Sequence, residues 1–138
     1  MGQPTTIIFS TPYGREEVNP SRESLRELVL NGGDEFWAAA SGQAAIELDG
    51  AAGGRLLLMG LEAAGFLLIY EPSTGHDFCS VNPSDTAREQ DDVEVYVGGE
   101  PMRVPRRHFL DKETAWRVID DFLHDGRRST RLQWEPWL

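Results

Sequence analysis

The chain has 138 residues, of which 40% are hydrophobic, 9% are aromatic and 26% are charged. This composition supports one globular domain over residues 1–138 and argues against wholesale disorder. The net charge of −10 argues against a nonspecific nucleic-acid binder, because phosphate recognition depends on Lys and Arg, and it favours a cationic partner.

The expected compartment follows from the cysteine count and from the apolar runs. The single cysteine, Cys79, cannot form an internal disulfide, and no apolar run approaches the roughly 20 residues that span a bilayer. Residues 1–10 also lack the basic and apolar regions of a secretory signal. We therefore expect a cytoplasmic protein that has no membrane partner.

The N-terminal third predicts a strand, a helix and a second strand. Residues 5–9 are β-branched and aromatic and lead into the turn sequence of residues 11–14, which is typical of a strand that ends in a turn. Apolar residues at helical spacing predict a helix over 21–31, and Gly32-Gly33 is expected to end it in a left-handed conformation. Alternating apolar residues over 44–48 predict the next strand, with a hairpin turn at Asp49-Gly50.

The middle of the chain holds two continuous apolar runs, residues 55–61 and 65–70. We interpret them as central strands, although one buried helix over both runs has the same apolar pattern. Residues 71–92 are rich in Pro, Ser, Asp and Gly, which predicts irregular connections with a short strand near 78–81.

The C-terminal third predicts a hairpin, a helix and a last strand. Residues 93–97 alternate as in a strand, Gly98-Gly99 ends it, and residues 102–104 can pair back. Asp111 is a good N-cap for an amphipathic helix that Gly126 ends, with its apolar stripe at Ala115, Trp116, Ile119, Phe122 and Leu123. Leu132 and Trp134 then indicate a final short strand.

Strands bracketed by two well-separated helices, without regular strand–helix alternation, predict an α+β fold. We expect a mostly antiparallel sheet with the two main helices packed on one face. Trp116 lies on the helical apolar stripe and is expected in the core, with Trp134 packed beside it.

The string Gly32-Gly33-Asp34-Glu35-Phe36 spells the signature loop of diguanylate cyclases. In that family the loop follows a longer set of strands and helices that hold the nucleotide and the metal, whereas only about thirty residues precede it here. We interpret the string as a helix end followed by an acidic turn.

His76, Asp77 and Cys79 are close in sequence and could be metal ligands, or a thiol with its base. A structural zinc site needs about four ligands, whereas there is no second cysteine and His108 and His124 stand in unrelated contexts. Neither a phosphate-binding glycine loop of Walker spacing nor a nucleophile elbow occurs. The sequence therefore predicts no catalytic residue, no metal ligand and no cofactor.

Charge is concentrated in the first two thirds of the chain. Residues 1–100 hold 17 acids and 5 bases, a net charge of −12, whereas residues 101–138 hold 6 acids and 8 bases, a net charge of +2. Residues 77–100 alone carry seven acids against one base, which fits either a solvated loop or a docking surface for a basic partner. The candidate partner-binding residues are Asp85, Glu89, Asp91, Asp92 and Glu94, with Trp137 as a partly exposed aromatic anchor.

At the C-terminal end, a helix that ends in Phe122-Leu123 is followed by Gly126, a basic residue and the strand Leu132-Gln133-Trp134. This arrangement resembles the Imm1 family of bacterial immunity proteins, whose members end in a helix, a Gly-x-Arg turn and a tryptophan. The resemblance covers residues 101–134, with weaker agreement back to residue 44. It departs at Ser129, where the family often has proline.

The resemblance implies an α+β protein encoded beside a polymorphic toxin, which it binds and blocks. That toxin is frequently a deaminase that acts on nucleic acid. The matching residues Phe122, Gly126, Arg128 and Trp134 look structural, so they do not locate the toxin-binding surface.

From these observations we expect a noncatalytic immunity protein whose partner is a basic toxin domain and which does not itself bind nucleic acid. Two other functions remain open. One is a noncatalytic regulatory domain with a different protein partner, and the other is a small ligand-binding protein or enzyme that uses residues 76–79. The sequence does not identify the toxin.

Overall fold

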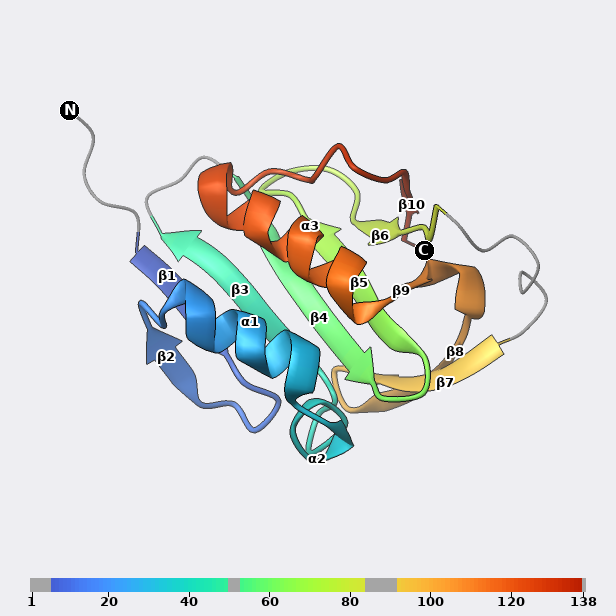
Figure 1. Ribbon diagram of the computed structural model, residues 1–138. Helices are drawn as coiled ribbons and strands as arrows, with labels where there is room; N and C mark the ends of the chain where they lie inside the picture. The colour runs from blue at the N-terminus through green and yellow to red at the C-terminus, as the bar shows by residue number, and fades with distance from the viewer. Residues whose placement is uncertain (1–5, 50–52, 84–91, 138) are drawn as a thin grey trace.

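The computed structural model describes residues 6–49, 53–83 and 92–137. These residues form an α+β fold in which two main helices lie over one face of an antiparallel sheet, as the sequence predicted (Figure 1). The helical elements are α1 (Arg22–Asn31), α2 (Asp34–Trp37), the 3-10 turn η1 (Arg106–His108) and α3 (Lys112–Asp125). Among the described residues, no helix has the length and apolarity needed to cross a membrane.

The main sheet has the strand order β10-β6-β5-β4-β3-β1-β2 in the described residues, and β9 pairs with β5 beside this path. Its strands are β1 (Thr6–Ser10), β2 (Glu16–Val18), β3 (Ala44–Asp49), β4 (Arg55–Leu61), β5 (Gly65–Glu71), β6 (Phe78–Ser80), β9 (Phe109–Leu110) and β10 (Trp134–Pro136). A separate antiparallel hairpin is formed by β7 (Asp92–Val97) and β8 (Glu100–Pro105). Neighbouring strands are antiparallel at every pairing among the described residues.

Local capping explains where the two main helices begin and end. The Ser21 side chain accepts a hydrogen bond from the Ser24 amide at the start of α1, and Asp111 does the same for Thr114 at the start of α3. Gly126 ends α3 with φ of 73°, a left-handed conformation that glycine adopts without strain.

The predicted left-handed stop at Gly32 is wrong. Gly32 has φ of −75° and ψ of 116°, which is extended backbone, while its amide donates to the Leu28 carbonyl oxygen. A Cβ atom at residue 32 would lie 2.6 Å from that oxygen. The position therefore suits glycine because the chain passes so close to the end of the helix.

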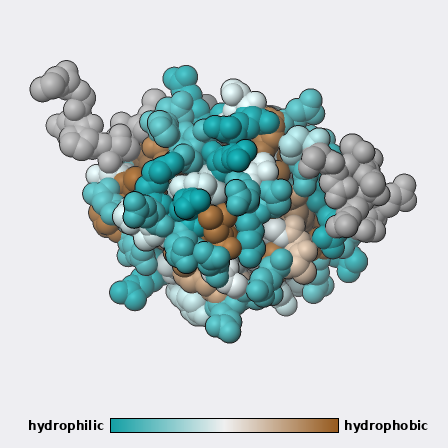
Figure 2. All heavy atoms as spheres, viewed as in Figure 1, coloured by the Kyte–Doolittle hydropathy of each residue, from teal (hydrophilic) through white to brown (hydrophobic). Residues whose placement is uncertain are grey.

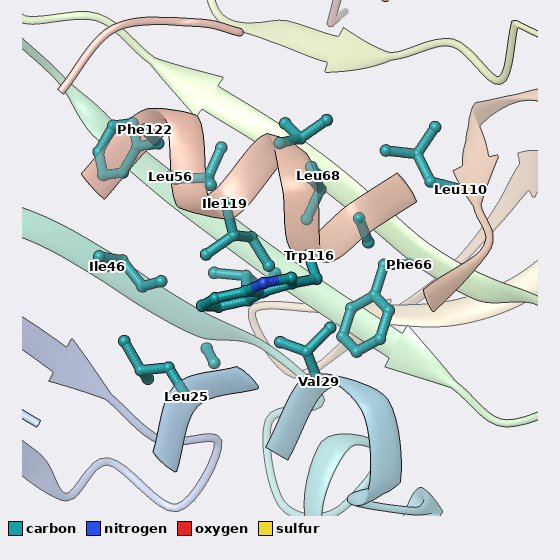
Figure 3. Close-up of a cluster of buried hydrophobic side chains, with 14 of the residues drawn as sticks. Leu25, Val29, Ile46, Leu56, Phe66, Leu68, Leu110, Trp116, Ile119 and Phe122 are labelled. Atoms are coloured by element: carbon teal, nitrogen blue, oxygen red, sulfur yellow. The ribbon is translucent and has the colours of Figure 1, made fainter. Parts of the chain in front are cut away.

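The helices cover one face of the sheet, which we call the front. Leu25 and Val29 of α1 and Trp116, Ile119 and Phe122 of α3 meet front-facing strand residues in one buried cluster (Figure 3). The strand residues in this cluster are Phe9, Ala44, Ile46, Leu48, Leu56, Leu58, Phe66, Leu68, Tyr70 and Leu110. Trp116 is buried there as predicted.

The opposite face of the sheet, the back, is covered by the β7–β8 hairpin over β4 and β5. Leu57 and Ile69 point to the back and form a second buried cluster with Val93, Val95 and Val104 of the hairpin. Because both of their faces are covered, β4 and β5 consist of nearly continuous apolar residues. The strand interpretation is thus confirmed over the buried helix.

Several elements differ from the sequence-based expectations. The final strand covers Trp134–Pro136 and not 132–134, because its partner β6 pairs with these three residues. The ring of Trp134 faces Tyr70, with ring centroids 6.5 Å apart. The short elements β2, β9, η1 and α2 were not predicted, and α2 occupies the position of the expected acidic turn at residues 34–36.

Candidate interaction surface

The residues that carry the family resemblance hold the C-terminal segment onto the sheet. The Arg128 guanidinium lies 3.9 Å above the centre of the Phe78 ring, which is a cation–π contact. The Trp134 indole N–H donates to the Ser129 carbonyl oxygen at 2.9 Å. The Tyr70 hydroxyl donates to the Gly126 carbonyl oxygen at 3.1 Å. Each contact joins the end of α3, or the loop after it, to other elements, which is a structural role.

Open hollows of about 520 and 580 Å³ lie beside the loop of residues 127–131. Two of the arginines that line them have local partners: Arg131 donates to Asp121 at 2.7 Å, and Arg128 stacks on Phe78. The charge of these two side chains is therefore used within the fold.

His76, Asp77 and Cys79 do not converge on a site, because His76 is exposed and Cys79 is 1% exposed. Instead, the structure places Cys79 beside His108, with 3.6 Å between the thiol sulfur and Nδ1. The sequence had left His108 in an unrelated context, because the two residues are 29 positions apart. Among the described residues, no group of three His, Cys, Asp or Glu side chains could hold a metal ion.

The Cys79–His108 pair is held in neutral form. Nδ1 of His108 lies 2.9 Å from the Ser80 carbonyl oxygen, which can only accept, so this nitrogen carries the proton. Nε2 lies 3.9 Å from the Glu135 carboxylate. Burial raises the pKa of the Cys79 thiol to about 11 and lowers the pKa of His108 below its ordinary 6.5. The thiol therefore stays protonated near neutral pH, which disfavours nucleophilic chemistry.

The predicted acidic docking residues fall partly on the hairpin. Asp85, Glu89 and Asp91 lie outside the described residues. Asp92 and Glu94 are exposed on the outward side of β7, because they alternate with Val93 and Val95, which face the sheet.

The outward side of the hairpin also carries Tyr96, which is 45% exposed, and Arg103 of β8. Arg103 is paired with Glu94 in the strand register, and its Nε lies 4.0 Å from the Asp92 carboxylate. Trp137 is half-buried against the back cluster, and its amide donates to the Asp77 carbonyl oxygen at 2.8 Å. The structure therefore brings Asp92 and Glu94 onto one ribbon and places Trp137 on the same side of the sheet.

A second surface on the back, which the sequence did not reveal, lies beside the hairpin. We call it the sheet floor and define it as the back-facing residues of β1, β2 and β3 with the adjoining ends of β4 and β5. Strand register assigns to it Thr6, Ile8, Ser10, Glu16, Val18, Ala45, Glu47, Asp49, Arg55 and Glu71. Val18 lies opposite Ile8 only through the register of β2 against β1, which the sequence does not reveal.

Charge on the sheet floor is predominantly acidic. Arg55 donates through Nε to Glu71 at 2.7 Å, so these two side chains largely satisfy one another. Glu16, Glu47 and Asp49 remain as exposed acids. The outer surface of α1 differs, because it alternates the exposed residues Arg22, Glu23, Arg26 and Glu27. Figure 2 shows that the helix side as a whole is covered largely by hydrophilic residues.

Comparison with known protein families gives a match over most of the chain. A family model described as Immunity protein Imm1 matches residues 27–136. No curated protein matches the chain. The matched range includes α3, the β7–β8 hairpin and the C-terminal segment, whereas β1, β2 and the first half of α1 precede it.

Proposed function

Because the chain belongs to the Imm1 family of immunity proteins, we propose that it binds and neutralises one cognate bacterial toxin, a deaminase that acts on nucleic acid. It acts by occupying the toxin and not by catalysis of its own. The family supplies the immunity role, and the observation that supports the chemistry of the partner is the net charge of −10.

The two charges fit one another physically. A deaminase must admit a polyanionic strand to its pocket, so the entrance to that pocket is basic. An acidic protein can cover this entrance, and complementary charge raises the association rate and suppresses wrong partners. The same charge keeps the immunity protein itself away from nucleic acid.

We assign part of the contact to the acidic residues on and before the hairpin. Asp92 and Glu94 project outward from β7 with Tyr96 in the same row, which is consistent with a docking role. Asp85, Glu89 and Asp91 precede them in sequence, and Trp137 supplies an aromatic anchor on the same side of the sheet. Aromatic anchors surrounded by charge are typical of interface hot spots.

The test is neutralisation in cells. The protein is coexpressed with the toxic C-terminal domain that its genomic neighbour encodes, and survival and copurification are followed. A toxin variant with its catalytic glutamate replaced serves as the control for copurification without toxicity. Survival with copurification, together with inhibited deamination of a single-stranded substrate, is the expected result. Cell death despite soluble expression with every neighbouring toxin candidate would reject the immunity role and favour a regulatory domain with another partner.

The position of the contact is tested separately by the double charge reversal Asp92→Lys with Glu94→Lys. Both side chains are exposed, so the variant should fold. We expect slower association with the toxin by roughly 10-fold at low salt, because the reversal removes electrostatic steering. Unchanged association kinetics, measured by surface plasmon resonance, would show that the hairpin does not face the toxin.

A further inference from the structure

The hairpin covers only half of the back of the sheet. Its valines seal Leu57 and Ile69 on β4 and β5, whereas Val18 at the other edge of the sheet is 65% exposed. An uncovered sheet face in a small protein leaves apolar side chains in water unless another surface meets them. The sheet floor is such a face.

Strand register shows that the sheet floor is one continuous surface. One row of back-facing neighbours crosses five strands in the order Val18, Ile8, Glu47, Arg55 and Glu71. These residues are exposed or half-buried.

The next row begins at Glu16 and passes through Ser10 and Ala45 to Leu57 and Ile69, which lie beneath the hairpin. The β7–β8 hairpin therefore borders the sheet floor on one side.

Both ends of the sheet floor offer features that a partner could engage. On the side of the hairpin, Tyr96 lies close to Gly42, the second residue before β3. A Cβ atom on residue 42 would lie 2.8 Å from the Tyr96 Cβ. This contact fixes the backbone of a tyrosine whose side chain is 45% exposed. At the far end, an open hollow of about 350 Å³ is lined by Glu47, Asp49, Arg55 and Glu71, among other residues.

We propose that the sheet floor is the binding surface for the cognate toxin. Val18 and Ile8 make the apolar contact, and Glu16, Glu47 and Asp49 accept hydrogen bonds from lysine and arginine side chains of the toxin. This inference rests on the proposed function, and it places the main contact with the toxin on the sheet floor, beside the β7–β8 hairpin.

The charge of the sheet floor favours a basic toxin over a second copy of this chain or nucleic acid. The floor carries Glu16, Glu47, Asp49 and Glu71 against Arg55 alone, a net charge of −3. A second copy of the chain would bring two acidic surfaces together, and like charges across an interface are strongly unfavourable. Nucleic acid would be repelled for the same reason. A basic protein surface gains both the charge pairing and the apolar contact.

The experiment compares two double charge reversals of equal total charge. Glu47→Lys with Asp49→Lys changes the floor, and Glu23→Lys with Glu27→Lys changes the outer surface of α1. Both variants change the net charge by the same amount, so loss of general steering affects them alike. Binding to the catalytically inactive toxin domain is measured by calorimetry and surface plasmon resonance. A third variant, Val18→Lys, tests the apolar contact that Val18 makes.

We expect the floor reversal and Val18→Lys each to raise Kd by at least about 10-fold relative to the α1 control. Circular dichroism spectra should match wild type, because all of these side chains are exposed. Thermal midpoints should fall slightly, because Glu23 lies in the first turn of α1 and Glu47 lies opposite Arg55. If wild type binds the toxin and both floor variants bind it as the α1 control does, the sheet floor is not the toxin-binding surface, while the immunity role stands.

Two other outcomes also contradict the inference. If wild type neither binds nor neutralises any toxin encoded nearby, the immunity role itself fails, and the inference fails with it. The second outcome concerns the oligomeric state of the protein alone, measured by sedimentation. If wild type is a dimer and Val18→Lys dissociates it, the sheet floor binds a second copy of this chain and not the toxin.

Discussion

The two sides of the sheet are built differently. On the front, α1 and α3 cover strands from β1 to β5 with one continuous apolar cluster. On the back, among the residues that the structure describes, a two-stranded hairpin covers β4 and β5 and leaves β1, β2 and most of β3 open. The front therefore supplies most of the buried apolar area that stabilises the fold, while the back combines a smaller cluster with a free surface. In this chain, the larger part of the core lies on one face of the sheet and the exposed surface proposed for recognition lies on the other.

Neighbouring residues on β4 provide the strongest test of this difference. Leu58 faces the helices and Leu57 faces the hairpin, and both are buried. We expect Leu58→Ala to lower the free energy of unfolding by about 4 kcal/mol, because packed helices on a sheet collapse poorly into a cavity. Leu57→Ala should cost about 2–3 kcal/mol, because the hairpin can move to fill the space. Urea denaturation with an unchanged m-value measures both losses. Equal losses would mean that the hairpin covers the sheet as firmly as the helices do.

The back layer should also respond to pH, through His108. This ring lies between Arg107, Cys79 and Glu135, and burial lowers its pKa below 6.5. The unfolded chain therefore binds a proton at a higher pH than the folded chain does. Stability is complete above about pH 6.5, falls as the pH drops from there towards the folded pKa by at most about 1.4 kcal/mol per pH unit, and levels off below the folded pKa.

His108→Gln should flatten this pH dependence between about pH 7 and pH 5, because glutamine can donate to the Ser80 carbonyl oxygen but does not titrate. Denaturation midpoints across that interval measure the slope. Glu135 does not interfere, since its hydrogen bond with Arg107 lowers its pKa below the ordinary 4.5. An identical slope in the variant and in wild type would assign the acid sensitivity to another group.

The smallest expected effect concerns the sheet floor. Val18→Ala should change the free energy of unfolding by less than about 0.5 kcal/mol, because the side chain is 65% exposed. A loss of 1 kcal/mol or more in thermal denaturation would show that Val18 contributes to the core, and the separation of the two faces would then be incomplete.

The sequence predicted the elements that depend on local patterns. Alternation identified β3 and β7, and both ends of α3 were predicted because Asp111 and Gly126 act through neighbouring backbone groups. The strand β2 was missed because Glu16-Glu17-Val18 is short and polar and forms a strand only through pairing with β1. Gly32 misled the prediction, because its requirement is a close approach and not a left-handed conformation.

The candidate surface was predicted in part. Alternation over residues 93–97 predicted the strand β7, and the structure places Asp92 and Glu94 on its outward side. The sheet floor could not be derived from the sequence, because it depends on which strands are neighbours and in what register. The approach of His108 to Cys79 has the same origin, since tertiary folding joins residues 29 positions apart.

The alternation of side chains across β1 and β3 has a consequence for how new toxin–immunity pairs could arise. Phe9 and Ile46 lie in the core, whereas their chain neighbours Ile8 and Glu47 lie on the opposite side of the same backbone. A mutation at one of the outward positions leaves the inward side chains and the ladder of backbone hydrogen bonds in place. With the proposed toxin contact on the sheet floor, specificity changes by successive single mutations at these positions while the fold is kept, and the same positions can be randomised in the laboratory to obtain inhibitors of other basic enzymes.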